Sequence, residues 1–350
     1  MITTPEALAE ALDPIRRSDR VALDTEADSL HCYFEKLCLI QISVPGHDFL
    51  IDPLADLPLA PLFDELAGHQ LIIQGLDYDL RLLRRAGMTE TSPVFDTMIA
   101  ARLIGLMEFS LSALLKRFFG IELAKGSQKA NWARRPLSPK MIDYASNDTR
   151  YLLPLAEKLE AELHRLGRWE WFFQSCEKAR IATQTSRERD LDSLWRITGS
   201  GELRDQAAAL LRALWHWRDQ EARTVDRPSF HIARNDLLIE AARTWTTGQR
   251  FEIPHLHGSR RKRYLATVDE ALALSSSEWP KLVRGSRQRV TPEQERRFAE
   301  LKKIRDHAAA RHAIEPSLIA PKVTLESLAN DPEDAVPRLL PWQRELLGLD

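Results

Sequence analysis

Apolar and polar positions along the first 75 residues follow the short runs that are typical of β-strands. Runs of aliphatic and β-branched residues, bounded by turn-forming or charged residues, indicate strands. The first two runs are apolar over most of their length, which is typical of central strands buried on both faces. Pro45 and Gly46 predict a hairpin turn after the second. The four runs are RVALDTEA (20–27), KLCLIQISV (36–44), DFLIDPL (48–54) and LIIQG (71–75).

Helical periodicity takes over between these runs and after them. Strands that alternate with helices, followed by helices alone, predict a mixed α/β sheet domain that ends near residue 170. The predicted helices cover 3–13, 59–66, 77–87, 96–106, 110–119, 138–146 and 148–166.

The pattern changes from Trp169 onward, where no further strand-like run of any length occurs. Loops rich in Pro, Gly and Ser separate the helical stretches, so the second half is predicted to be all-α. A break at 285–292 divides it into two small bundles. The predicted helices cover 202–224, 235–246, 267–274, 292–312, 323–329 and 337–347.

The composition is that of an ordinary soluble globular protein, with 44% hydrophobic and 29% charged residues. No run of eighteen apolar residues predicts a membrane span, and the N-terminus lacks a secretory signal pattern, so no membrane partner and a cytoplasmic location are expected. Three cysteines without metal-ligand spacing predict neither a disulfide framework nor a zinc site. A net charge of −2 excludes a uniformly basic nucleic-acid binder and leaves local basic patches open.

Two segments carry residue types that contact nucleic acid. Four consecutive cations at 260–263 form either a solvated face or a set of phosphate contacts. The segment 125–138 combines cations and an amide with one indole, which suits phosphate binding and base stacking, although a solvated loop has the same composition. The candidate nucleic-acid-binding residues are Lys125, Gln128, Trp132, Arg134, Arg135, Arg260, Arg261, Lys262 and Arg263.

Asp24 and Glu26 stand at the end of the first predicted strand. Strand alternation places both side chains on one face, about 7 Å apart along the strand. Because two buried carboxylates repel each other and lose solvation, a divalent cation between them is the functional interpretation. The alternative interpretation is a strand end that runs into a polar loop, with both acids solvated.

Three further polar residues occur where the predicted elements bring side chains toward a sheet edge. Asp79 opens the helix after the fourth strand, where it forms part of a site or stabilises the helix dipole. Tyr144 and Asp148 are four residues apart, which places them on one face of a single helix. The alternative is that Asp148 caps a following helix and Tyr144 belongs to the core.

In this order, these motifs resemble the three exonuclease motifs of the DEDD 3′–5′ exonuclease superfamily, and Tyr144 is similar to the tyrosine of its DEDDy branch. The residues between these motifs resemble the corresponding segments of ribonuclease D. The second half resembles the helicase-and-RNase-D C-terminal (HRDC) domain, with a second, more divergent copy. The segments that carry the resemblance are KLCLIQIS, FDTMIAARLIG (95–105), 128–152, 210–242, 305–329 and 339–348.

The resemblance implies a ribonuclease H-like (DnaQ-like) mixed-sheet domain followed by helical HRDC-type bundles. The implied boundaries are 1–170 for the exonuclease domain, 171–200 for a linker, and 201–285 and 290–350 for the two bundles. The implied activity is 3′–5′ exoribonuclease cleavage of RNA with a single-stranded 3′ end, of the kind that matures tRNA and other structured RNAs.

Two divalent ions, Mg²⁺ or Mn²⁺, are the cofactors that the resemblance implies. It assigns Asp24, Glu26 and Asp148 to the first ion, and Asp24 with Asp79 to the second. Tyr144 is implied to orient the attacking water. Gln74 departs from the family, in which His often opens the second motif. A DNA 3′–5′ exonuclease and a non-catalytic RNA-binding protein on the same fold remain the alternatives.

Overall fold

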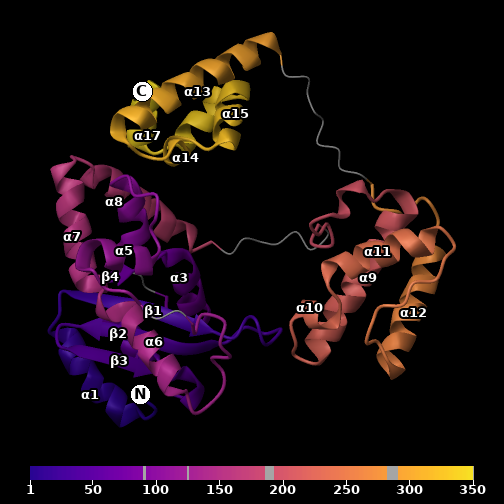
Figure 1. The fold of residues 1–350 in the computed structure, drawn as a ribbon, viewed down its shortest axis with the longest axis horizontal. Helices are drawn as coiled ribbons and strands as arrows, with labels where there is room; N and C mark the ends of the chain where they lie inside the picture. Colours follow the sequence, from indigo (N-terminus) through magenta and orange to yellow (C-terminus); the bar gives the residue numbers. More distant parts are fainter. Residues whose placement is uncertain (90–91, 124–125, 186–192, 282–290, 350) are drawn as a thin grey trace. The chain divides into compact units, whose positions relative to one another are not determined.

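The computed structural model describes residues 1–89, 92–123, 126–185, 193–281 and 291–349. Its contacts divide the chain into two compact units (Figure 1). Unit 1 comprises residues 1–27, 37–186 and 288–350, and unit 2 comprises residues 28–36 and 187–287. Unit 1 holds the sheet, and unit 2 is helical in its described residues.

A five-stranded mixed sheet with the order β3-β2-β1-β4-β5 forms the centre of unit 1. β1 pairs antiparallel with β2 and parallel with β4. The four predicted strands are confirmed, whereas β5 was missed because three residues are too few to show an alternation. The strands are β1 (Arg20–Ala27), β2 (Leu37–Val44), β3 (His47–Ile51), β4 (Gln70–Ile73) and β5 (Val94–Asp96).

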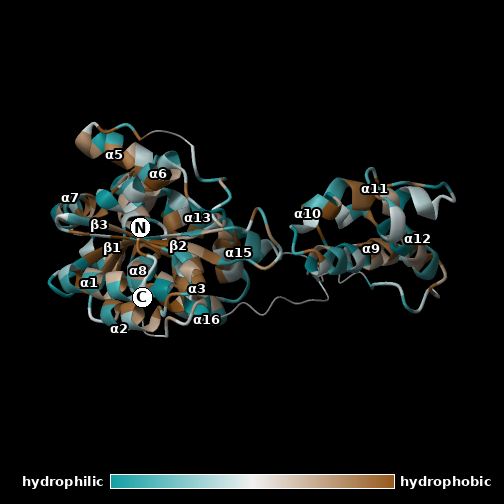
Figure 2. Cartoon of the chain, turned by 90° about the horizontal axis from the view of Figure 1, so that it is seen from below, coloured by the Kyte–Doolittle hydropathy of each residue, from teal (hydrophilic) through white to brown (hydrophobic). Residues whose placement is uncertain are grey.

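Helices cover both faces of the sheet, and the strands between them are mostly hydrophobic (Figure 2). Every residue of β2 is buried, as expected for a strand with helices above and below it. The helices are α1 (Pro5–Arg16), η1 (Pro53–Ala55), α2 (Ala60–Leu66), α3 (Leu76–Arg85), α4 (Thr97–Leu103), α5 (Leu111–Phe119), α6 (Pro139–Arg150), α7 (Leu152–Arg165) and α8 (Trp169–Ala182).

Helix α8 differs from the prediction of a linker over 171–200. Phe172 and Cys176 of this helix are buried in the core of the sheet unit, and Phe172 packs on Phe95 of β5 with 4.5 Å between ring centroids. Apolar residues at helical spacing within a polar stretch form this contact, so the sheet unit extends to the end of α8.

The C-terminal helices share the core of unit 1, whereas the sequence predicted a separate bundle over 290–350. The ring of Trp342 stacks on Trp171 at 5.0 Å between centroids. Arg168 is buried and donates hydrogen bonds to the carbonyls of Leu103 and His312. The elements are α13 (Pro292–His312), α14 (Pro316–Ile319), α15 (Lys322–Asn330), α16 (Pro332–Ala335), η3 (Val336–Arg338) and α17 (Pro341–Leu347).

Unit 2 has a hydrophobic core of its own, which includes Trp217 and the fully buried Tyr264. Residues 28–36 belong to this unit, because Asp226 accepts hydrogen bonds from the backbone N–H groups of Tyr33 and Phe34. Its elements are η2 (Ser200–Glu202), α9 (Asp205–Thr224), α10 (Ser229–Ile232), α11 (Asn235–Thr246) and α12 (Gly258–Leu272). In the described part of the chain, every helix is too short or too polar for a transmembrane span.

The helices α13, α14 and α15 repeat α9, α10 and α11 at a constant spacing. Each begins 87 residues after its counterpart. A hydrogen bond repeats with them: Arg218 donates to the carbonyl of Ala233 at 3.1 Å, and Arg305 donates to the carbonyl of Ala320 at 3.0 Å. This repeat supports the predicted second, divergent copy of the helical bundle.

Candidate active site

Strand β1 positions the first two acids of the site. Asp24 and Glu26 alternate with the buried residues Leu23 and Thr25, so their side chains lie on the same face of the sheet. Helix α6 covers that face and contacts β1 and β2. The solvated strand end considered for these acids is therefore excluded, because both carboxylates lie beneath a helix.

Helix α6 supplies the next two residues. Its N-terminus is fixed by Ser138, whose hydroxyl accepts the backbone N–H of Met141, and by Pro139 in the first turn. Tyr144 and Asp148 both lie within this helix, one turn apart. Asp148 is therefore not the cap of a following helix, and the Tyr144 hydroxyl lies close enough to its carboxylate to lower its pKa.

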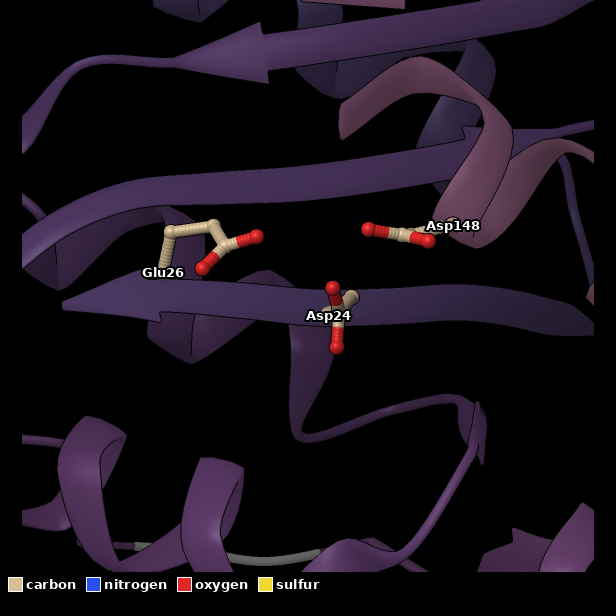
Figure 3. Close-up of side chains that lie close together, drawn as sticks. All are labelled: Asp24, Glu26 and Asp148. Atoms are coloured by element: carbon tan, nitrogen blue, oxygen red, sulfur yellow. The ribbon is translucent and has the colours of Figure 1, made fainter. Parts of the chain in front are cut away.

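The carboxylates of Asp24, Glu26 and Asp148 converge (Figure 3). One oxygen from each lies within 4.8 Å of the other two, and all three side chains are partly buried. Asp24 and Glu26 come from β1, and Asp148 reaches toward them from α6. These three residues are called the acidic cluster below.

Asp79 lies beside the acidic cluster without being one of its members. It is buried in the first turn of α3, and its carboxylate accepts the backbone N–H of Thr25 at 3.1 Å and the Thr25 hydroxyl at 2.5 Å. β4 pairs with β1 only at residues 20–22. Asp79 therefore satisfies a backbone donor that the sheet leaves open at Thr25, and this contact holds it next to Asp24.

Asp96 fixes the start of α3 and was not recognised in the sequence. Its buried carboxylate accepts backbone N–H groups from Gly75 and Leu76 at the start of α3, and from Met98 and Ile99 at the start of α4. Four donors on one carboxylate join the two helix N-termini. Asp96 thereby sets the position of Asp79, one turn into α3.

Gln74, the departure from the family pattern, joins the same framework. Its side-chain amide donates to the carbonyl of Phe109 at 2.8 Å and accepts the hydroxyl of Thr97. The Gln74 carboxamide is thus occupied by hydrogen bonds within the protein, as expected for a residue that is not a metal ligand.

Burial and the charges of neighbouring acids raise the pKa of every member of the acidic cluster. Burial is the largest cause for all three residues: it raises the pKa of Asp24 to about 8, that of Glu26 to about 10 and that of Asp148 to about 7. The negative charge of Asp148 further raises the pKa of Asp24, and Asp24 does the same to Glu26. Burial also raises the pKa of Asp79 well above its ordinary value.

The donor set fits a hard divalent cation. Three carboxylate oxygens in one partly buried cluster are the ligands that such ions prefer. Among the described residues, none of the charges that shift the pKa of Asp24, Glu26 or Asp148 is positive. A bound divalent ion would compensate the repulsion that these residues exert on one another.

We expect the metal-free protein to lose stability as the pH rises from about 6 to about 8.5. The pKa values of Asp24 and Asp148 in the folded chain lie above the value near 4 of an unfolded aspartate. Within that window the unfolded chain has released protons that the folded chain retains, so a higher pH favours unfolding. The expected Tm in EDTA is several degrees lower at the higher pH.

Thermal melts at both pH values, with and without a saturating divalent ion, measure this effect. The ion should remove most of the difference, and Asp24→Asn should reduce it in EDTA. The exposed Asp77→Asn on α3 should leave it unchanged. Equal Tm values at the two pH values in EDTA would contradict the electrostatic description of the cluster.

The tyrosine of the site keeps its proton. Burial and the charge of Asp148 raise the pKa of Tyr144 above its ordinary value near 10. A neutral phenol donates a hydrogen bond and does not act as a base near neutral pH. The ring of Tyr144 packs near Trp132, with 6.1 Å between centroids, which fixes its position over the cluster.

The segment 125–138 meets the prediction only in part. Trp132 is buried in a core cluster, so its indole offers no face to a base. Arg135 donates to both carboxylate oxygens of Asp52 and to backbone carbonyls, so it is a structural residue. Gln128 and Arg134 are exposed, whereas Lys125 lies outside the described residues.

The basic run 260–263 forms the first turns of α12, before the helix start predicted at 267. Arg260 and Arg263 pair with the buried Glu221, and Arg261 pairs with Glu252. Three of the four cations thus hold unit 2 together, which argues against them as phosphate contacts. Lys262 is exposed on the same helix.

A small, open hollow lies beside the acidic cluster, and sequence reasoning did not find it. Tyr144 and Asp148 form part of its wall, together with residues from α6 and from the loop before it. Lys140 lies one turn before Tyr144, on the same face of α6. This helical spacing is the feature of the sequence that could have indicated the hollow. The other lining residues are Leu123, Gly126, Ser127, Asp143 and Asn147.

Comparison with known proteins gives two family matches. Residues 1–164 match the model of the 3′–5′ exonuclease family, and residues 207–267 match that of the HRDC domain. The chain is similar to ribonuclease D of Cronobacter turicensis, with 31% identity over 99% of this chain and 97% of that protein.

Solved structures give the same grouping. The chain is similar to the crystal structure of Escherichia coli RNase D, described as an exoribonuclease involved in structured RNA processing, with a TM-score of 0.72 and 26% identity over 99% of this chain and 96% of that one. A protein from Bifidobacterium adolescentis gives a TM-score of 0.85 at 26% identity, over 99% and 94% of the two chains.

Proposed function

Because this chain belongs to the ribonuclease D family, and is thus a 3′–5′ exoribonuclease that acts on RNA, we propose that the acidic cluster is the place where it hydrolyses RNA. The observation that carries the proposal is the convergence of the Asp24, Glu26 and Asp148 carboxylates within 4.8 Å. Tyr144 adds a hydroxyl beside the Asp148 carboxylate.

The proposed cofactors are two divalent ions, Mg²⁺ or Mn²⁺. Asp24, Glu26 and Asp148 would hold one of them, and Asp79 with Asp24 would contribute to the second. When bound, such ions supply an activated water and charge neutralisation for phosphodiester hydrolysis. Oxygen ligands favour Mg²⁺ or Mn²⁺ over Zn²⁺, which more often takes His or Cys.

The protein residues prepare the reaction by position. β1 and α6 hold the carboxylates in place before any substrate binds, so little reorganisation is needed. Tyr144 keeps its proton and presents a hydroxyl beside Asp148, where it can orient a water molecule against the scissile phosphate. Its proposed role is orientation, because a phenol with a raised pKa is a poor general base.

The hollow beside the cluster is the proposed place for the terminal nucleotide. The exposed cation of Lys140 can contact a phosphate, and the polar side chains of Ser127 and Asn147 can contact a ribose or a base. The site takes up a free chain end, so a single-stranded 3′ end is the proposed substrate.

The proposed substrate class is tRNA precursors and other structured RNAs whose 3′ ends are single-stranded. The description of Escherichia coli RNase D as a structured-RNA exoribonuclease supports this class. We further propose that unit 2, in which residues 207–267 match the HRDC domain, contributes to RNA binding.

A degradation assay on matched single-stranded RNA and DNA tests the proposed function. With 5′-labelled oligonucleotides and Mg²⁺ or Mn²⁺, we expect a ladder of RNA products that shorten one nucleotide at a time, and no products in EDTA. An RNA with a 3′-terminal phosphate is a control for entry at a free 3′ end. Faster degradation of the DNA would favour the DNA exonuclease, and no products from either would favour a non-catalytic RNA-binding protein.

A further inference from the structure

Gln41 lies directly across the sheet from the central acid of the site. It is the partner of Asp24 in the antiparallel register of β1 and β2. Residues paired in this way point to the same face, with about 4.5–5.5 Å between their Cβ atoms. Gln41 is fully buried, whereas Asp24 remains partly open to solvent. Its carboxamide therefore lies at the inner wall of the acidic cluster.

The carboxamide of Gln41 is an unsatisfied polar group. Neither its Nε2 nor its Oε1 has a hydrogen-bond partner among the described residues. A buried amide without partners costs free energy, and an apolar side chain of the same size would avoid that cost. Polar side chains in this position need an explanation beyond packing.

The next residue on the same face of β2 behaves differently. Ser43 donates a hydrogen bond to Asp48 at 2.6 Å and shares one of 2.7 Å with the hydroxyl of Thr149. Both side chains lie between the sheet and α6, but only Ser43 is satisfied within the protein. On this face of β2, the missing partners thus set Gln41, which lies beside Asp24, apart from Ser43.

We propose that Gln41 is a positioning residue for Asp24, an inference that rests on the proposed function. Its Nε2 donates a hydrogen bond to the Asp24 carboxylate when a divalent cation is bound there. The bond fixes the direction of the carboxylate oxygens toward the cation. A neutral donor suits this place, because a lysine or arginine would compete with the cation for the same oxygens.

The test compares Gln41→Met with the wild-type chain by calorimetric titration with Mn²⁺ alone and by thermal melts in EDTA. Methionine has a similar length and lacks a hydrogen-bond donor. Loss of the hydrogen bond should weaken Mn²⁺ binding about 10- to 100-fold. The Tm in EDTA should stay the same or rise, because the unsatisfied amide is gone. A higher Mn²⁺ concentration should recover most of the rate.

Ser43→Ala is the matched control. It removes a satisfied hydroxyl from the same strand face, so it should lower the Tm in EDTA and leave Mn²⁺ affinity unchanged. Gln41→Leu replaces Gln41→Met if the latter does not fold. Wild-type Mn²⁺ affinity in a folded Gln41 variant would overturn the inference, as would a lower Tm with unchanged affinity. Absence of Mn²⁺ binding by the wild-type chain would instead reject the proposed metal site itself.

Discussion

Replacement of Asp24 by alanine should lower the rate of RNA degradation by about three orders of magnitude or more. Asp24 is central to the acidic cluster: its charge raises the pKa of both Glu26 and Asp79. Its loss removes the carboxylate common to both proposed ions. A loss of about 10³-fold corresponds to about 4 kcal/mol of transition-state stabilisation, which fits the removal of a divalent ion that neutralises developing charge.

Single-turnover degradation of a labelled RNA, together with Mn²⁺ titration, measures the effect of Asp24→Ala. The variant should remain folded, with a Tm in EDTA at about pH 8 no lower than that of the wild type, because a repelling buried acid is gone. Asp77→Ala in the first turn of α3 is the control and should retain activity, since its exposed side chain pairs with Arg81. Retained cleavage in Asp24→Ala would refute the assignment of the cluster.

Replacement of Tyr144 by phenylalanine should lower kcat about 10²-fold and leave RNA and metal affinity unchanged. The ring would keep its packing near Trp132, and only the hydroxyl beside Asp148 would be lost. Loss of a group that orients the attacking water acts on the transition state and not on binding. The expected size is at the low end for a group that assists proton transfer.

Separate measurements of kcat, RNA affinity and Mn²⁺ affinity distinguish this role from a structural one. Tyr151→Phe removes a hydroxyl from the residue that ends α6 and should leave kcat unchanged. If Tyr144→Phe shows wild-type kcat, Tyr144 takes no part in the reaction. If Mn²⁺ affinity falls in parallel with kcat, the hydroxyl acts through the position of Asp148 and not through water.

The strands were predictable to the extent that they were long. β1 and β2 have eight residues each, and their apolar runs stand out against the polar turns around them. β5 has only three residues, which are too few to show a period. Helix α8 was missed because its apolar residues do not form one clear stripe: positions 169, 171, 172 and 173 are all aromatic.

The acidic residues of the site were predictable because their spacing along one strand and one helix shows which side chains share a face. A spacing of two on a strand and of four on a helix puts side chains on one face, which applies to Asp24 with Glu26 and to Tyr144 with Asp148. Gln41 and Asp96 follow a different rule. Their importance depends on strand register and on two helix N-termini that meet, and neither is visible in a local pattern.

The basic residues show the same limit. Arg260 and Arg263 share Glu221, which lies 39 and 42 residues earlier in the chain. A run of cations in the sequence does not indicate which acidic residues will pack against it after folding. A run that forms ion pairs and a run that binds phosphate therefore look the same in the sequence. The burial of Trp132 likewise depends on tertiary packing. A single tryptophan in a loop forms no periodic pattern from which its burial could be predicted.

The constant spacing of 87 residues between the two sets of helices bears on the history of the chain. Such a spacing over three successive helices is what a tandem duplication leaves when later insertions and deletions fall outside the repeated segment. Sequence has diverged between the copies, but the arginine that reaches the carbonyl after each four-residue helix has persisted. A tandem duplication would account for two bundles with one plan, of which one shares its core with the sheet unit and the other has a core of its own.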